Sequence, residues 1–472
     1  MSKGSLVQAF LTKYSLPIHL AILASAVLAS LCVPLRYGGI TVFILAVSAA
    51  EFVFLLPSVH TGETFVDARD RVWRGLVRDA FFYVGILGLL IALSQWLNSG
   101  CSLVYQPSAN AWQMSLPPMP GLPFSVKTST AGEVLNRSVA VFVAVCALRL
   151  AVGKRGKRKL FAVLGCVSGC IAVIMMFRTG ANPGAVVPLP VGFLFGFWAI
   201  VGMGSYLGVC QEPENTGIHP LLVILGIGAN TVGGLYFSNV FWAAVLLFLI
   251  LVFAIYGFFF LARRSEAKQL MSYGCFFFLL SGGAILILGY FMPGNPIQRH
   301  FNFWMTVDLE EAWNVWSAAW RTRMDAALDI WKGHWGWGVG VDGFREFLGF
   351  SVTGKAWSAF KTDPGLVYND CLQFLCEYGL SGFVLFLSAF LSLVIPVVFR
   401  SRSFLAQQGE AKGALDRRDF LQLDPFFFTG AFAVVLGIVQ AWFASPFHAP
   451  GYCLSWMMVL ASLPVFLPEV GD

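Results

Sequence analysis

The side chains most able to do chemistry in this chain form a polar cluster at the start of an apolar segment. The cluster contains Tyr368, Asn369 and Asp370, followed by Gln373 and Glu377. Asn369, Gln373 and Glu377 are spaced four residues apart, so they share one face of a helix. Polar groups near the end of a membrane helix are unfavourable unless they face protein or water. They therefore either hydrogen-bond neighbouring helices and cap this one, or form the chemical site of the protein.

Arginines that could bind phosphate lie upstream, in residues 308–332, whose pattern predicts a helix. Its tryptophans fall on one stripe of that helix: Trp313, Trp316, Trp320 and Trp331. Arg321 and Arg323 fall on the flanks of the stripe. A tryptophan-lined helix of this kind lies flat at a membrane interface. It is either only an anchor, or its arginines reach a phosphate, because the planar guanidinium binds phosphate oxygens in a bidentate way.

A run of glycines separates this helix from the polar cluster, and residues 338–343 read GVGVDG. The run has the formal spacing G-x-G-x-x-G, but a dinucleotide-binding fingerprint must follow a strand and begin a helix. Here a helix precedes the run and the surroundings are apolar. We therefore expect tight turns and close backbone packing at these glycines rather than a nucleotide site.

The composition is that of a multi-span membrane protein. Of the 472 residues, 57% are hydrophobic and 12% are charged, whereas soluble domains contain about 25% charged residues. The net charge of +6 comes from basic residues clustered in short connectors, so it does not indicate nucleic-acid binding. The cysteines lie mostly in apolar segments and show neither a disulfide framework nor a zinc pattern. We expect no metal and no cofactor.

About twelve segments reach the length of about 20 apolar residues that a membrane helix needs. They cover roughly 17–34, 37–57, 79–98, 137–153, 159–177, 185–210, 218–236, 238–262, 270–292, 370–399, 425–445 and 448–468. The predicted fold is an all-α polytopic membrane protein with one large loop between spans nine and ten. Residues 1–292 form spans one to nine, 293–369 form the extracytoplasmic loop, and 370–472 form spans ten to twelve.

Basic residues set the expected orientation, because cytoplasmic connectors are enriched in lysine and arginine. These residues are few in most short connectors and gather in four: 58–78, 154–159, 263–269 and 400–424. This pattern places both termini in the cytoplasm and the loops at 99–136 and 293–369 outside it. The first of these loops is rich in proline and serine, and we expect it to be a cap or linker.

The order of features around the long loop resembles the O-antigen ligase and O-antigen polymerase family of membrane glycosyltransferases. The resemblance rests on the pair Trp320-Arg321, on the glycine turn GWGVGVDGF, and on the run Asn369-Asp370, Leu372-Gln373 and Glu377-Tyr378-Gly379. The turn from Arg178 to Gly184 and the hairpin at 445–451 are also similar to parts of the family. Twelve spans with one large outer loop fit the same resemblance.

The chain departs from the family pattern at three places. The family usually has histidine where this chain has Tyr368, and a Ser-Arg-Gly where this chain reads Ser238-Asn239-Val240. It often has histidine in span eleven, where this chain has Gln440. These departures count against the catalytic activity of the family more than against membership in the family.

The resemblance implies transfer of a glycan from an undecaprenyl-diphosphate carrier to a lipid or glycan acceptor, at the outer side of the bacterial inner membrane. The predicted catalytic residues are Tyr368, Asn369 and Asp370, together with His448 on the separate ground given below, and Gln373 and Glu377 form a supporting polar face. Arg321 or Arg323 would hold the diphosphate, and Arg178 is a further candidate. Whether the acceptor makes this a ligase or a polymerase stays open. Two alternatives also stay open: an inactive relative that binds lipid-linked glycan, and a transporter or flippase for such glycans.

His448 is expected to supply the base that position 368 lacks. A tyrosine titrates near pH 10 and is a poor base at neutral pH, whereas histidine titrates near 6.5. Tyr368 can still donate a hydrogen bond. His448 lies in the hairpin between Pro446 and Pro450, which holds it rigidly at the membrane surface. We predict that His448 approaches Asn369 and Asp370. The alternative is a lone interfacial histidine.

Overall fold

The computed structural model of the chain describes residues 65–412 and 424–467. Within these ranges it leaves out 102, 107, 109–110, 116, 151, 182–189, 212–217, 263–281, 284, 286, 288–294, 353–359 and 361–364. The predicted spans at 17–34 and 37–57 therefore lie outside the described residues, as does nearly all of the span at 270–292.

Seven helices of the described part are long and apolar enough to cross a membrane. They lie in α4 (Ala80–Leu97), α5 (Thr128–Leu150), α6 (Lys154–Ala181), α7 (Pro190–Gln211), α9 (Pro220–Phe237), α15 (Asp370–Lys412) and α16 (Pro425–Phe443). Shorter apolar stretches lie in α10 (Val240–Ala262) and α17 (Pro450–Ser462). The chain is therefore a helical membrane protein, and the figure of twelve spans stays a prediction.

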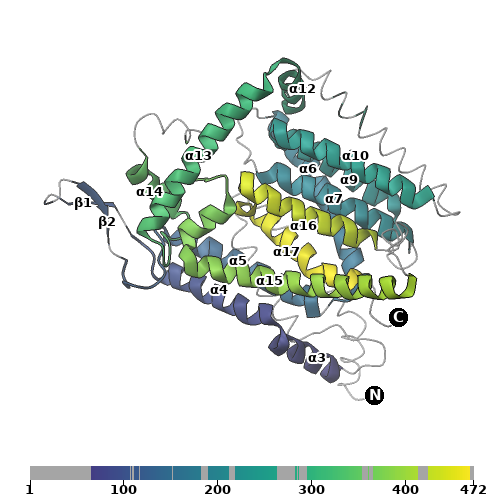
Figure 1. Cartoon of the computed structure of the whole chain (residues 1–472), viewed down its shortest axis with the longest axis horizontal. Coiled ribbons are helices and arrows are strands. Elements are labelled where there is room, and N and C mark those ends of the chain that lie inside the picture. The colour runs from purple at the N-terminus through teal and green to yellow at the C-terminus, as the bar shows by residue number, and fades with distance from the viewer. Residues whose placement is uncertain are drawn as a thin grey trace.

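The long helices run side by side with α7 at the centre of the bundle (Figure 1). The apolar window of α7 is 94% buried, whereas that of α15 is 11% buried. Helix α7 packs against α6, α9 and α16, and its Trp198 donates a hydrogen bond to Ser455 of α17 at 3.1 Å. Helices α4 and α15 lie at the periphery, α5 packs against both α4 and α17, and α3 (Phe65–Arg78) precedes α4.

A second group of helices lies across one end of the bundle. It consists of α12 (Pro296–Thr306), α13 (Leu309–Gly333) and α14 (Gly343–Ser351), and Figure 1 shows α13 running crosswise to the long helices. The helix predicted at 308–332 is confirmed, and Asp308 caps it by accepting a hydrogen bond from the Glu310 N–H at 2.9 Å. The rings of Trp316 and Trp320 stack at 5.9 Å, and both lie against Phe443 of α16. Part of the tryptophan stripe therefore packs on protein.

The all-α class is confirmed, with one small sheet in addition. Strands β1 (Leu103–Gln106) and β2 (Ala111–Met114) pair in an antiparallel way within the loop at 99–136. Their sequences, LVYQ and AWQM, contain valine, tyrosine and tryptophan, which favour strands. The hairpin projects away from the bundle, next to the end of α4 (Figure 1).

Candidate functional site

A cavity of about 620 Å³ lies between α4, α5, α15 and α17, beside the short helix η4 (Pro446–His448). One part of its wall is apolar and comes from the middle of the long helices, with Leu89, Phe142, Leu385, Phe386 and Met457 among its residues. The other part is polar and includes Glu133, Arg137, Asp342, Asp370, Glu377 and His448. The cavity can therefore hold a molecule that has an apolar chain and a polar group.

Asp370 and His448 meet at the polar end of the cavity. Nδ1 of His448 lies 3.5 Å from one carboxylate oxygen of Asp370, and the other oxygen accepts the N–H of Phe447 at 3.0 Å. The Asp370 carboxylate thus holds both the hairpin backbone and the imidazole. The side chain of His448 is 36% exposed, and because the residue lines the cavity, a molecule there can reach it. The predicted approach of His448 to the polar cluster is present.

Gln373 contacts the other nitrogen of the same imidazole. Its Oε1 accepts the Val367 N–H at 3.1 Å, and its Nε2 lies 2.9 Å from Nε2 of His448. Because the amide oxygen is occupied, the –NH₂ group is assigned to the histidine side. This favours a neutral ring with its proton on Nδ1, facing Asp370. The same –NH₂ group also donates to the Gly365 carbonyl at 2.8 Å and to Glu377 at 3.0 Å. Its two hydrogens serve three acceptors, so the contact with His448 can yield to another partner.

The charges around His448 and the Gln373 amide favour opposite protonation states of the imidazole. Burial lowers the pKa of His448, but the hydrogen bond to Asp370 and the carboxylates of Glu377, Asp370 and Asp342 raise that pKa above its ordinary value overall. The pKa of Asp342 is itself raised by burial, although Lys127, His448 and Arg345 oppose that shift. The carboxylates therefore favour a protonated imidazole, whereas the Gln373 amide favours a neutral one. His448 can change its protonation state within this setting.

Asn369 and Tyr368 have contacts of a different kind. Asn369 is fully buried, and its side chain accepts the Leu372 N–H at 3.0 Å and donates to the Trp442 carbonyl at 3.3 Å. It caps the start of α15 and ties it to α16. Tyr368 has a positive φ of 58°, and its carbonyl accepts the Trp320 indole N–H at 3.1 Å. Neither residue lines the cavity.

The arginines expected to hold phosphate lie outside the cavity wall. Arg323 is 1% exposed, donates to the Leu366 carbonyl, and stacks between the rings of Phe360 and Tyr368 at 4.9 and 4.3 Å. Arg321 is exposed on α13, and Arg178 is exposed in the last turn of α6. The rest of the turn that follows Arg178 lies outside the described residues.

The glycine run makes the turns that were predicted, and it contacts the helix that carries the polar cluster. Gly338 and Gly340 have φ of 73° and 81°. Helix α15 breaks at Gly379, where φ is 66° and ψ is −173°. Four backbone hydrogen bonds join the two segments at the break: Val339 N–H to Cys376 O, Gly340 N–H to Glu377 O, Leu380 N–H to Trp335 O, and Ser381 N–H to Gly336 O. The loop thereby provides hydrogen-bond partners for the backbone groups that the break in α15 leaves unpaired, and it fixes the position of Glu377.

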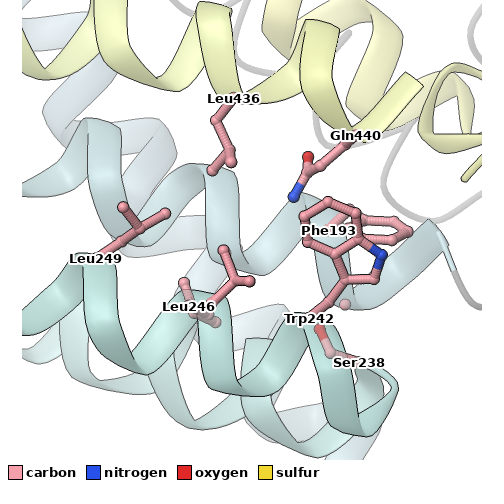
Figure 2. A pocket seen from close by; sticks show the side chains of 10 residues that line it. Phe193, Ser238, Trp242, Leu246, Leu249, Leu436 and Gln440 are labelled. Carbon is pink, nitrogen blue, oxygen red and sulfur yellow. The ribbon is translucent and has the colours of Figure 1, made fainter. Parts of the chain in front are cut away.

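Gln440, one of the three departures from the family pattern, lines a smaller pocket. Ser238 and Gln440 line it together with Phe193 and Trp242, and Figure 2 shows the Gln440 side chain turned towards the two rings. The amide oxygen of Gln440 accepts the Tyr452 O–H at 2.8 Å. The Tyr452 ring in turn lies 5.6 Å from Phe447, next to His448. Gln440 therefore supports the packing beneath the hairpin.

Two more histidines lie in the segment 293–369, which was predicted to be outside the cytoplasm, and both contact backbone. His300 lies 3.1 Å from the Leu235 carbonyl, and burial lowers its pKa. His334 lies 3.2 Å from the carbonyl of Ile330, one turn earlier in its own helix. Both serve local structure, which leaves His448 as the histidine that lines the cavity.

Sequence reasoning missed Arg137, Glu133 and Asp342 as residues of the cavity. Arg137 and Glu133 lie one turn apart in α5 and form an ion pair at 3.1 Å. The signal that could have found them is an arginine inside an otherwise apolar span, which is a functional candidate by default.

In the described part of the chain, no group of three or more His, Cys, Asp or Glu side chains is placed to hold a metal ion. Comparison with protein-family models and with curated proteins gives no match to this chain.

Proposed function

We propose that this protein transfers a glycan from an undecaprenyl-diphosphate carrier to a hydroxyl group of a lipid or glycan acceptor, at the outer side of the bacterial inner membrane. One observation carries the proposal: the cavity joins an apolar wall along the membrane helices to a polar end with Asp370, Glu377 and His448. A polyprenyl-linked glycan has the same order of apolar chain and polar sugar. The resemblance of the loop residues to O-antigen ligases and polymerases supports the same reading.

The chemistry needs a base, and His448 is placed to be one. In the proposed step the acceptor oxygen attacks the anomeric carbon of the donor sugar while its proton moves to His448. The bond between that carbon and the diphosphate oxygen breaks, and its electron pair leaves with the lipid diphosphate. Asp370 holds the imidazole at Nδ1 and stabilises the imidazolium that forms. For this step the –NH₂ group of Gln373 must give up its contact with Nε2 of His448. It can do so because its two hydrogens have two other acceptors, the Gly365 carbonyl and the Glu377 carboxylate.

The sequence-based roles of the other residues stay part of the proposal. Arg321 is exposed on the helix whose Trp320 contacts the Tyr368 carbonyl, so it can reach a diphosphate from the outer side. Arg178 is a second exposed candidate. Arg323, Tyr368 and Asn369 contribute by fixing the start of α15, which carries Asp370.

The proposal is tested by comparing the glycolipids of cells with and without the gene by mass spectrometry. Loss of the protein should deplete one surface glycoconjugate and accumulate its lipid-linked precursor. Wild-type protein should restore the pattern, whereas His448→Ala, expressed at the same level, should not. Identical glycolipid and precursor profiles in the two strains would contradict the proposal.

A further inference from the structure

Arg137 is the arginine that lines the cavity in the part of the chain that the structure describes. It lies on α5, within the candidate membrane span Thr128–Leu150. A charged side chain at such a position is unfavourable unless it faces a polar cavity or a partner, and this is why such residues commonly mark binding sites. Arg137 therefore needs an explanation beyond packing.

The guanidinium of Arg137 is only partly paired. Its Nη2 lies 3.1 Å from the carboxylate of Glu133, and its Nε is buried without a hydrogen-bond partner. The side chain is 29% exposed, and Arg137 lines the cavity. A guanidinium has five N–H donors in a planar fork, so an anion can bind while Glu133 stays in place.

Arg137 lies at the boundary between the polar and the apolar wall. Along α5 the cavity is lined by Thr130, Glu133 and Val134 before Arg137, and by Ser138, Ala140, Val141 and Phe142 after it. On helix α15 the charged lining residues, Asp370 and Glu377, come before Gly382, and the lining residues from Gly382 onward are apolar. A lipid phosphate ester has its charge at the equivalent place, between the apolar chain and the polar group it carries.

The charges at the polar end favour the same position. Asp342, Asp370 and Glu377 line that end, and carboxylates at short range repel a phosphate. Tyr378 of α15 and Cys453 of α17 line the same cavity. A phosphate is therefore held best at Arg137, and the carboxylates are left for hydroxyl groups.

We propose that Arg137 forms a phosphate-binding site inside the cavity, for a lipid phosphate ester whose polyprenyl chain lies along the apolar wall. The identity of the lipid rests on the proposed function, whereas the site itself rests on the geometry. Arg137 would bind the phosphate from within the membrane spans. The other three arginines, Arg321, Arg323 and Arg178, do not line the cavity.

The experiment measures binding of undecaprenyl phosphate and of undecaprenol to the purified full-length protein by native mass spectrometry. The wild-type protein should bind the phosphate about tenfold or more tightly than the alcohol, the value for a hydrogen-bonded charge pair. Arg137→Gln should bring that ratio close to one and leave binding of undecaprenol unchanged, which also shows that the variant is folded. Arg137→Lys should give an intermediate ratio, because it keeps the charge and loses the fork.

Control measurements separate the possible sources of the phosphate. Arg299→Gln, an exposed arginine on α12, should leave the ratio at the wild-type value. Inorganic phosphate should compete only weakly with undecaprenyl phosphate.

The site assignment is overturned if Arg137→Gln keeps the wild-type ratio, or if Arg321→Gln removes it instead. The polyprenyl assignment is overturned if phosphatidylglycerol shows the same Arg137-dependent binding. A normal ratio in a protein that transfers no glycan would contradict the proposed function and leave the site intact.

Discussion

Nδ1 of His448 lies 3.5 Å from a carboxylate oxygen of Asp370, although the two residues belong to different segments of the chain. Asp370 begins α15, and His448 ends the short helix between α16 and α17. The contact is reinforced by the hydrogen bond from the Phe447 N–H to the other oxygen of the same carboxylate. It therefore joins the start of α15 to the hairpin between α16 and α17 at the polar end of the cavity, and its strength depends on the protonation of His448.

The stability of the protein should depend on pH through His448. The pKa of His448 is raised in the folded protein, mainly because Asp370 and its neighbouring carboxylates outweigh the effect of burial. The stabilising contribution is then fully present below the unfolded value of about 6.5 and is lost as the pH rises through the folded-state pKa. Thermal unfolding between pH 5.5 and 8.5 should show a Tm that falls with pH in the wild type and falls less in His448→Gln. Equal pH dependence in the two proteins would exclude this coupling.

The break in α15 at Gly379 should be intolerant of a side chain. Gly379 has φ of 66°, and a Cβ there would collide with the Gly336 carbonyl oxygen, which accepts the Ser381 N–H. Gly379→Ala should lower the free energy of unfolding by about 1–3 kcal/mol, the cost of a strained backbone, or more if the collision is not relieved. The matched control is Gly349→Ala in α14, where a Cβ meets nothing within 4 Å. That change should stabilise the helix slightly.

Part of this arrangement could be predicted from the sequence, because its signals are local. The spacing of Trp313, Trp316 and Trp320 gave the helix at 308–332, and the glycine spacing gave the turns at Gly338 and Gly340. The two prolines around His448 indicated a rigid hairpin. Each of these features depends on residues within one or two turns of one another.

The remaining features depend on which helices are neighbours, and the sequence does not contain that information in readable form. Arg323 lies on α13 as expected, but Phe360 and Tyr368 from another segment enclose it. Arg137 is the first residue of the predicted span 137–153, where the sequence does not separate a span residue from a connector residue. Its place in the cavity follows only from the packing of α5 against α4 and α17.

Asp342→Asn should stabilise the protein at neutral pH. Burial raises the pKa of Asp342, so the folded state loses stability as the pH rises from the unfolded value of about 3.9 through the folded-state pKa. Asparagine removes that loss and also tolerates the positive φ of 56° at this position. The Tm of Asp342→Asn should equal that of the wild type near pH 4 and exceed it at pH 7. A Tm below that of the wild type at pH 7 would show that the carboxylate makes a favourable contact.

The two loop arginines should respond differently to substitution. Arg323 is buried between two rings and donates to the Leu366 carbonyl, so Arg323→Ala should lower the free energy of unfolding by about 2 kcal/mol or more. Arg321 is exposed, and Arg321→Ala should change that free energy by less than about 0.5 kcal/mol. A fall in glycan transfer in Arg321→Ala at unchanged stability would assign Arg321 to the diphosphate. Equal destabilisation by both changes would contradict the packing of Arg323.

The initial rate of glycan transfer by the purified protein in lipid nanodiscs tests the role of His448 most directly. The donor is the undecaprenyl-diphosphate-linked glycan that accumulates in cells without the gene, and the variants are His448→Ala and His219→Gln, an exposed histidine before α9. His448→Ala should lower the rate about 100-fold or more, as expected for loss of a general base, while His219→Gln transfers at the wild-type rate. Transfer by His448→Ala at the wild-type rate would contradict the assignment of His448 as the base.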